Sequence, residues 1–211
     1  EDVTLSGAGI AGGRFERCRF VRCNFASADL RDATLEDCQF VGEAAGNGAS
    51  FAFARLSRAR LTRCDLSGAR FQGADLYEAR LEDCNLLGAS FARASFGRVF
   101  GRKVERFAAE FLGCNLQLAD LSAARLPGCS LARSDLREAD LSGADLSEAD
   151  LSGANIFKTI LDAAKLAGAD LRGAEVSGLD LRRLADHQDM KIGPDQQFRL
   201  LDAMGIDVRP E

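Results

Sequence analysis

The sequence predicts an all-β fold in which the chain winds into a four-sided coil of short, equal sides. A large apolar residue recurs at every fifth position, and a small residue, Ala or Cys, nearly always stands two positions before it. The stretch from Ala139 to Ala154 reads ADLSGADLSEADLSGA. A period of five fits neither a helix, which repeats every 3.6 residues, nor a simple strand, which repeats every two. A fixed short period indicates a repeat array.

The five-residue register continues through three runs that cover most of the chain. The runs extend from Leu5 to Phe40, from Phe51 to Phe96 and from Phe111 to Leu181, and together they contain 33 central apolar positions. Each large side chain meets the same environment only if every pentapeptide forms one side of a coil and then turns a corner. Four sides close a square, and squares stacked at about 4.8 Å would make a rod roughly 40 Å long.

Each pentapeptide divides its residues between the inside and the outside of the coil. In Cys64-Asp65-Leu66-Ser67-Gly68, the small and central residues point inward and the polar residues point outward. Gly and Ser after the central residue suit a tight corner. The narrow interior can be filled only if large and small side chains alternate in ladders.

The cysteines support this arrangement, because all seven occupy the small position two residues before a central residue. These are Cys18, Cys23, Cys38, Cys64, Cys84, Cys114 and Cys129. Free Cys behaves as a small buried hydrophobe, so we expect inert core thiols. An odd count without an apolar N-terminal segment argues against a disulfide framework. Without a C-x-x-C pair, and with one histidine, a zinc site is not expected. We therefore expect no metal, no cofactor and a reducing, cytoplasmic compartment.

No catalytic constellation is visible. The only histidine, His187, lies in a polar stretch, the serines fall at corners, and no phosphate-binding glycine motif is present. We therefore predict that the protein is not an enzyme. No apolar run approaches the roughly 18 residues that cross a membrane, so no membrane partner is expected.

The net charge of −5 is unevenly distributed, with +2 in residues 1–106 and −7 in residues 107–211. The acidic excess stands just before successive central residues, at positions that would mark all four faces of a square coil. These residues are Asp135, Asp140, Asp145, Asp150 and, further on, Asp170. Spaced carboxylates would repel nucleic acid, so direct DNA binding is not expected, and would attract a basic groove such as one that holds DNA. Alternatively, they only keep the rod soluble.

Two interruptions of the register are candidate binding elements. Residues 41–50 are small and nearly uncharged, and predict a surface loop with Glu43 and Asn47 as candidate contacts. Residues 97–108 carry a local charge of +3 and several apolar residues, a combination typical of interfaces. Alternatively, this loop folds back and its phenylalanines close the coil wall. The candidate partner-binding residues here are Arg98, Val99, Phe100, Arg102, Lys103, Val104, Arg106 and Phe107.

The five-residue repeat ends after Leu181. This predicts a coil over residues 1–184 and a cap or dimerisation segment over residues 185–211. Pro194 and Asp195 are typical of a helix start, and we expect a helix over 195–204 that ends at Gly205. An open coil end exposes core and backbone groups, so it requires a cap or a second copy. The candidate dimer contacts are Phe198, Leu201, Met204 and Ile206.

The quintet A-[DN]-L-x-x resembles the signature of the pentapeptide-repeat family over residues 5–181, which implies a right-handed quadrilateral β-helix. A narrower resemblance is to the Qnr-type quinolone-resistance proteins. It is carried by RFERCRF from Arg14, the two interruptions, GCNL from Gly113, GLDLRR from Gly178 and QQFRLLDAMGI from Gln196.

This resemblance implies a cytosolic, rod-shaped homodimer, joined through its C-terminal ends, that binds DNA gyrase and topoisomerase IV and protects them from fluoroquinolones. The resemblance suggests either DNA mimicry by the rod or displacement of the drug by the larger loop. Because this loop is basic here, we favour residues 98–108 as the active element and the acidic rod as a docking surface. Two alternatives stay open: a self-immunity protein against a natural gyrase poison, or a scaffold with no topoisomerase role.

Overall fold

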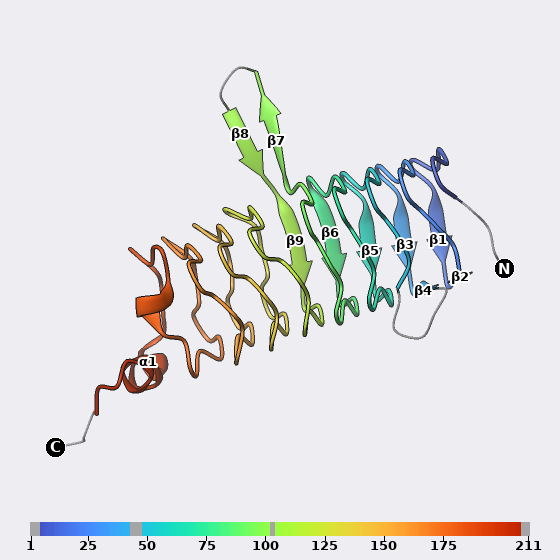
Figure 1. Ribbon diagram of the computed structural model, residues 1–211. Helices are drawn as coiled ribbons and strands as arrows, with labels where there is room; N and C mark the ends of the chain where they lie inside the picture. The colour runs from blue at the N-terminus through green and yellow to red at the C-terminus, as the bar shows by residue number, and fades with distance from the viewer. Residues whose placement is uncertain (1–4, 43–47, 102–103, 208–211) are drawn as a thin grey trace.

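The computed structural model describes residues 5–42, 48–101 and 104–207. The described chain forms one rod of stacked rungs, with a two-stranded hairpin standing out from its side and a short helix at its C-terminal end (Figure 1). The predicted all-β coil with one short C-terminal helix is confirmed.

The rungs are held together by parallel backbone pairing. Along one face lies a five-stranded parallel sheet, and a second pair of strands lies on another side. The sheet consists, in order, of β1 (Arg14–Glu16), β3 (Thr34–Glu36), β5 (Arg60–Thr62), β6 (Ala79–Glu82) and β9 (Ala109–Leu112). The pair consists of β2 (Arg19–Val21) and β4 (Gln39–Val41). The other sides pair through single bridges.

The spacing of these pairs shows that four pentapeptides make one rung. In the regular part, paired residues lie 20 positions apart, as in Asp120↔Asp140 and Asp140↔Ile160. Across the first interruption the offset is 26 residues, and across the second it is 30, as in Leu81↔Phe111. The extra residues of both interruptions therefore leave the coil register intact.

Many corners are tight turns closed by a backbone hydrogen bond. At one corner the amide of Ala144 donates to the carbonyl of Leu141 at 3.0 Å. The residue between them, Gly143, has φ of +65°, and the equivalent corner residues Glu138 and Glu148 have φ of +58° and +59°. Only glycine adopts this left-handed conformation without steric cost, so corners with other residues are strained.

The interior is filled as the alternation of large and small residues predicts. Every central residue from Phe25 to Val176 is buried, and so are six of the seven cysteines. The rings of Phe51, Phe71 and Phe91 stack on successive rungs with centroids 5.0 and 4.9 Å apart, close to the strand spacing of about 4.8 Å. Cys18 is only partly buried because it lies near the N-terminal end of the coil.

The C-terminal end of the coil is closed by a glutamine and a helix. Backbone pairing continues past the last five-residue repeat, since Leu166 and Leu171 donate to the carbonyls of Asp186 and Lys191. Buried Gln196 then donates its side-chain amide to the carbonyls of Leu171, at 2.7 Å, and Ala174, at 2.8 Å. The carbonyl of Leu171 also accepts the amide of Ala174, whereas Gln196 supplies the donor for the carbonyl of Ala174, which no further rung covers.

The segments around Gln196 are short helices. They are the 3-10 helices η1 (Leu181–Arg183) and η2 (Pro194–Gln196) and the α-helix α1 (Gln197–Ala203). Pro194 opens η2, and Gly205, with φ of +79°, follows α1, as the sequence predicts.

The corner geometry yields a stability prediction. Gly143→Ala adds a Cβ that meets nothing within 4 Å, so it introduces left-handed strain without a clash. We expect a loss of about 1 kcal/mol of unfolding free energy, seen as a lower thermal midpoint. Glu138→Ala is the matched control, because that corner already carries a Cβ at positive φ. Equal midpoints for the two variants would contradict the strain argument.

Candidate functional site

The second interruption forms an antiparallel hairpin rather than an irregular loop. Strand β7 (Gly97–Phe100) pairs with β8 (Val104–Phe107), and Gly97 faces Phe107 at the base. The hairpin projects away from the rod between β6 and β9 (Figure 1). At its base the amide of Ala108 donates to the carbonyl of Phe96 at 3.1 Å, which returns the chain to the coil.

One side of the hairpin is fixed to the rod by Arg98. Its guanidinium forms an ion pair with Asp75 at 2.8 Å and lies 4.8 Å from the centroid of the Tyr77 ring. The Tyr77 ring in turn lies 6.0 Å from that of Phe100. An arginine predicted to meet a partner is thus held by the protein's own rod.

The other side of the hairpin is fixed by an arginine of the rod. Arg125 donates two hydrogen bonds to the carboxylate of Glu105, at 2.9 and 2.8 Å, and its guanidinium lies 4.8 Å from the ring centroid of Phe107. The Phe107 ring packs, half-buried, against the core. The bidentate pair restricts the geometry of β8 as well as adding energy, and the single Arg98–Asp75 contact orients β7. We call the contacts of Arg98 and Arg125 the two arginine clamps.

The clamps leave a small exposed surface on the hairpin. Val99 and Phe100 are 63% and 44% exposed, and exposed Arg106 lies 5.9 Å from the centroid of the Phe100 ring. The proposed fold-back of both phenylalanines onto the coil wall therefore holds for Phe107 and is wrong for Phe100. The remaining predicted contacts lie outside the described residues, with only the backbone of Val104 described: Arg102, Lys103, Val104, Glu43 and Asn47.

The acidic residues of the repeat mark all four faces of the rod, and each also stabilises a corner. The Oδ1 of Asp140 accepts the backbone amide of Ser142 at 2.9 Å, and the same contact recurs at Asp135, Asp145, Asp150 and Asp170. These carboxylates are therefore turn-forming groups as well as surface charges.

Arginines two positions further on neutralise part of this lattice. Arg137 pairs with Asp135 at 2.6 Å and Arg172 pairs with Asp170 at 2.6 Å, and the arginine hydrogen bond lowers the pKa of both carboxyls. Within the described ranges, Asp140 and Asp150 form no ion pair. Asp145 lies 4.0 Å from Lys165, so three of the five named aspartates are in ion pairs.

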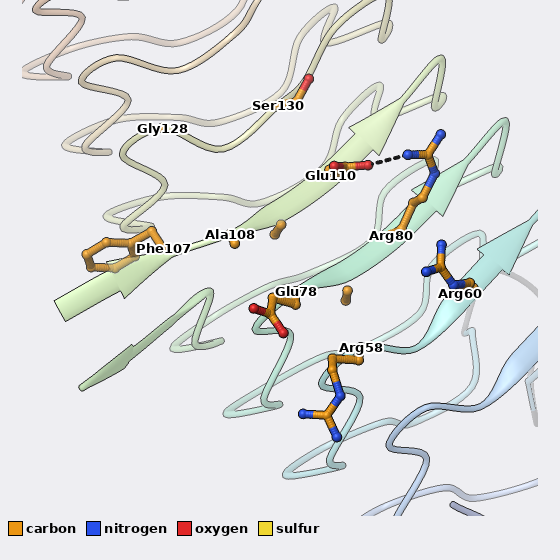
Figure 2. A pocket seen from close by; sticks show the side chains of 11 residues that line it. Arg58, Arg60, Glu78, Arg80, Phe107, Ala108, Glu110, Gly128 and Ser130 are labelled. Atoms are coloured by element: carbon orange, nitrogen blue, oxygen red, sulfur yellow. Dashed lines mark hydrogen bonds and ion pairs between the residues drawn. The ribbon is translucent and has the colours of Figure 1, made fainter. Parts of the chain in front are cut away.

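Beside the base of the hairpin lies an open groove of about 490 Å³, which we call the trough. It lies across β5, β6 and β9, and Figure 2 shows the side chains around it. Its lining includes Arg58, Arg60, Glu78, Arg80, Phe107, Ala108, Glu110, Gly128 and Ser130. No pattern in the linear sequence distinguished this surface, because its residues come from four different rungs.

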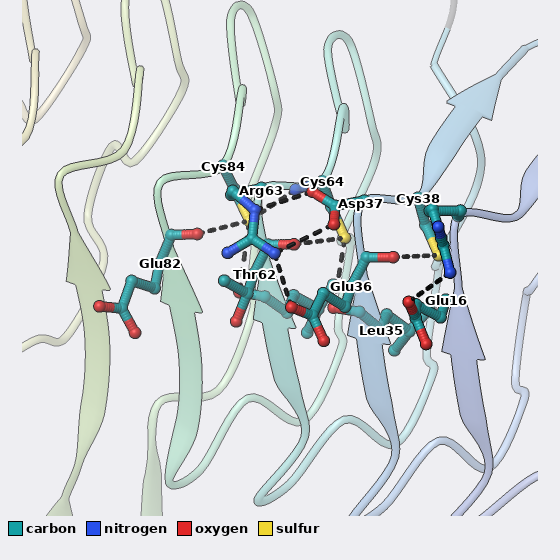
Figure 3. Close-up of polar contacts among 12 residues, drawn as sticks. Glu16, Leu35, Glu36, Asp37, Cys38, Thr62, Arg63, Cys64, Glu82 and Cys84 are labelled. Atoms are coloured by element: carbon teal, nitrogen blue, oxygen red, sulfur yellow. Dashed lines mark hydrogen bonds and ion pairs between the residues drawn. The ribbon is translucent and has the colours of Figure 1, made fainter.

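The thiols form a ladder inside the coil. The Sγ of Cys64 contacts the carbonyls of Thr62, at 3.5 Å, and Leu35, at 3.4 Å, and Cys38 and Cys84 repeat this arrangement on neighbouring rungs (Figure 3). Burial raises the pKa of Cys38 to about 11, and the contact with Cys114 raises that of Cys84 to about 12. A thiol that stays protonated is a poor nucleophile and metal ligand, which favours inert core thiols. No cluster of three potential metal-ligating side chains occurs among the described residues.

Comparison with known proteins identifies the family to which the chain belongs. The profile of the pentapeptide repeat region matches residues 13–91, and that of pentapeptide repeats in eight copies matches residues 114–153 and 149–183. The chain belongs to the pentapeptide-repeat family. Its fold is therefore the right-handed quadrilateral β-helix of that family. No curated protein matches the chain.

Solved structures of QnrB1, described as a plasmid-mediated fluoroquinolone resistance protein, are similar over the whole length. Full-length QnrB1 is 30% identical, with a TM-score of 0.87 over 96% of this chain and 97% of the other. A trypsin-treated QnrB1 variant is 29% identical, with a TM-score of 0.88 over 100% of both chains. The resemblance to Qnr-type proteins is confirmed. In the part of the chain that the structure describes, no helix has the length and apolarity needed to cross a membrane.

The clamps predict how the hairpin responds to one substitution. Arg125→Ala removes the contacts to Glu105 and Phe107, so we expect amide exchange in β8 to become about tenfold faster, which corresponds to a loss of about 1 kcal/mol. Amides of the regular rungs should keep their protection, as measured by hydrogen–deuterium exchange. Arg133→Ala, at an exposed arginine without an ion pair in the described regions, is the control. Unchanged β8 exchange in Arg125→Ala would contradict the clamp.

Proposed function

We propose that this protein binds DNA gyrase and topoisomerase IV in the cytoplasm and protects them from fluoroquinolones. The observation that carries the proposal is the similarity to QnrB1 over the full length of both chains, hairpin and C-terminal helix included. The protein acts by binding rather than by catalysis, since its interior is filled with side chains and its polar groups serve corners and ion pairs.

The hairpin is the active element of this proposal. Its exposed surface combines Val99, Phe100 and Arg106, and aromatic and arginine side chains dominate binding at protein interfaces. Because the clamps orient the hairpin before binding, little conformational entropy is lost when a partner engages it. The acidic rod contributes a docking surface for basic protein groups, chiefly through carboxylates such as Asp140 and Asp150, which form no ion pair with the arginines that the structure describes.

The same proposal includes a homodimer formed through the C-terminal ends. Phe198 and Ile206 are 60% and 46% exposed there, and Leu201 and Met204 are partly buried beside them. Exposed apolar side chains that cap an open coil fit a two-fold contact between identical ends.

A gyrase supercoiling assay in the presence of ciprofloxacin tests the function. We expect the intact protein to restore supercoiling, and the variant in which residues 98–106 are replaced by two glycines to restore less than a tenth as much. This variant keeps Gly97, Phe107 and Ala108, which join the hairpin to the coil. The measurement is the protein concentration that gives half-maximal rescue, with an unchanged thermal midpoint as the folding control.

Other outcomes of this assay favour the alternatives. Failure of the intact protein to rescue supercoiling at any concentration would leave a scaffold without a topoisomerase role. Rescue against a natural gyrase poison, but not against ciprofloxacin, would favour a self-immunity protein. Equal rescue by the hairpin-less variant would shift the activity from the hairpin to the rod.

The dimer is tested by one substitution at the end of the rod. Phe198→Glu places a charge in the proposed contact, so we expect sedimentation analysis to show a change from dimer to monomer at micromolar concentration. Phe157→Glu, at another exposed phenylalanine, should leave the dimer intact. A monomeric wild type, or a Phe198→Glu variant that remains dimeric, would contradict this interface.

A further inference from the structure

The trough exists because the side chains in one column of corner residues become small along the rod. On successive rungs this column contains Arg58, Glu78, Ala108 and Gly128. The last two leave space beside the face of β9, and Phe107, held by its clamp, forms a wall of that space. A volume of about 490 Å³ lies within the range of sites that hold small ligands, so the trough accommodates a few residues rather than a folded domain.

Among the described residues, the cationic side chains of the trough are paired with one exception, and the carboxylate of Glu78 also forms no ion pair. Arg58 forms a bidentate pair with Asp32, at 2.6 and 2.8 Å, and Arg80 contacts Glu110 at 2.6 Å. Arg60, which lies between them on β5, is exposed and forms no ion pair within the described ranges. Figure 2 shows its guanidinium apart from the Arg80–Glu110 pair. The trough thus offers one guanidinium with all of its donors available, and a guanidinium binds a carboxylate in bidentate geometry.

We propose that the trough binds a short, extended acidic segment of the partner protein, with a carboxylate on Arg60 and an apolar side chain against Phe107. The identity of the partner as a topoisomerase rests on the proposed function; the chemistry of the segment does not. A nucleic-acid strand fits less well, because its repeated phosphates would meet Glu78 and Glu110 in the same trough. A peptide with one carboxylate avoids this repulsion.

The trough and the hairpin form one composite surface, because Phe107 belongs to both. A segment bound in the trough lies at the foot of β8, so the exposed hairpin residues and the trough engage neighbouring parts of the same partner. Two linked contacts strengthen each other through effective concentration. Loss of the Arg60 contact should therefore weaken the complex without abolishing it.

The test compares two charge reversals at exposed arginines that lack ion pairs in the described structure. Arg60→Glu lies in the trough and Arg133→Glu lies outside it. We expect Arg60→Glu to raise the Kd for DNA gyrase about tenfold, and Arg133→Glu to leave it within twofold of the wild type, as measured by surface plasmon resonance. Equal Kd values for wild type and Arg60→Glu would overturn the proposal, whereas absence of gyrase binding by the wild type would overturn the proposed function instead.

A second probe tests the trough without gyrase. A short peptide with blocked ends that contains one aspartate flanked by leucines should bind the wild type and Arg133→Glu with millimolar affinity, and Arg60→Glu at least tenfold more weakly, as judged by NMR chemical-shift changes. The wild type should not bind a short DNA duplex under the same conditions. The acidic-segment proposal would be overturned if Arg60→Glu left the affinity for the peptide unchanged. It would also be overturned if the DNA duplex bound and this binding depended on Arg60.

Discussion

The constraint on which this structure depends is the backbone ladder between rungs. Each side of the coil donates backbone hydrogen bonds to both neighbouring rungs, as Leu141 donates to Ile160 of the following rung and Asp140 donates to Ala119 of the preceding rung. A rung that is shifted by one residue would misplace its central side chain and leave buried amides without partners, which costs more than any surface contact returns. Insertions are therefore confined to places where the chain leaves the coil and returns in register.

This constraint explains why binding elements occur only on the outside. The interior is filled on every regular rung, so partners can meet only corners, faces, ends and the hairpin. The corners carry much of the polar chemistry, because an aspartate before many of the central residues fixes the turn that follows it. These carboxylates would be needed for the turns even in a rod that bound nothing. Their regular spacing alone therefore cannot reveal a function.

The period of five and the position of the cysteines were sufficient to predict the fold, because both report directly on a narrow interior. The contacts of the candidate site were less predictable, because they join residues about one rung apart. Arg98 meets Asp75 and Arg125 meets Glu105, at separations of 23 and 20 residues, and no local motif links either pair. Once the rung length is known, a search at offsets near 20 would find both clamps. The trough also appears only when the corner column from Arg58 to Gly128 is read down the rod.

The distribution of paired charges separates the two mechanisms that an acidic rod suggests. A DNA strand presents one charge every 3.4 Å without interruption. In the row of carboxylates before the central residues, each described acidic face is interrupted by an ion-paired or a non-acidic residue. On one face, Asp120 and Asp140 are adjacent without ion pairs, but Ile160 follows them. On the opposite face, Asp150 is followed by Asp170, which Arg172 neutralises. A surface so interrupted imitates a nucleic-acid backbone poorly, whereas it can still orient the rod on a basic partner. The hairpin, oriented by contacts that neutralise Arg98 and Glu105 within the molecule, would then present Val99, Phe100 and Arg106 to that partner.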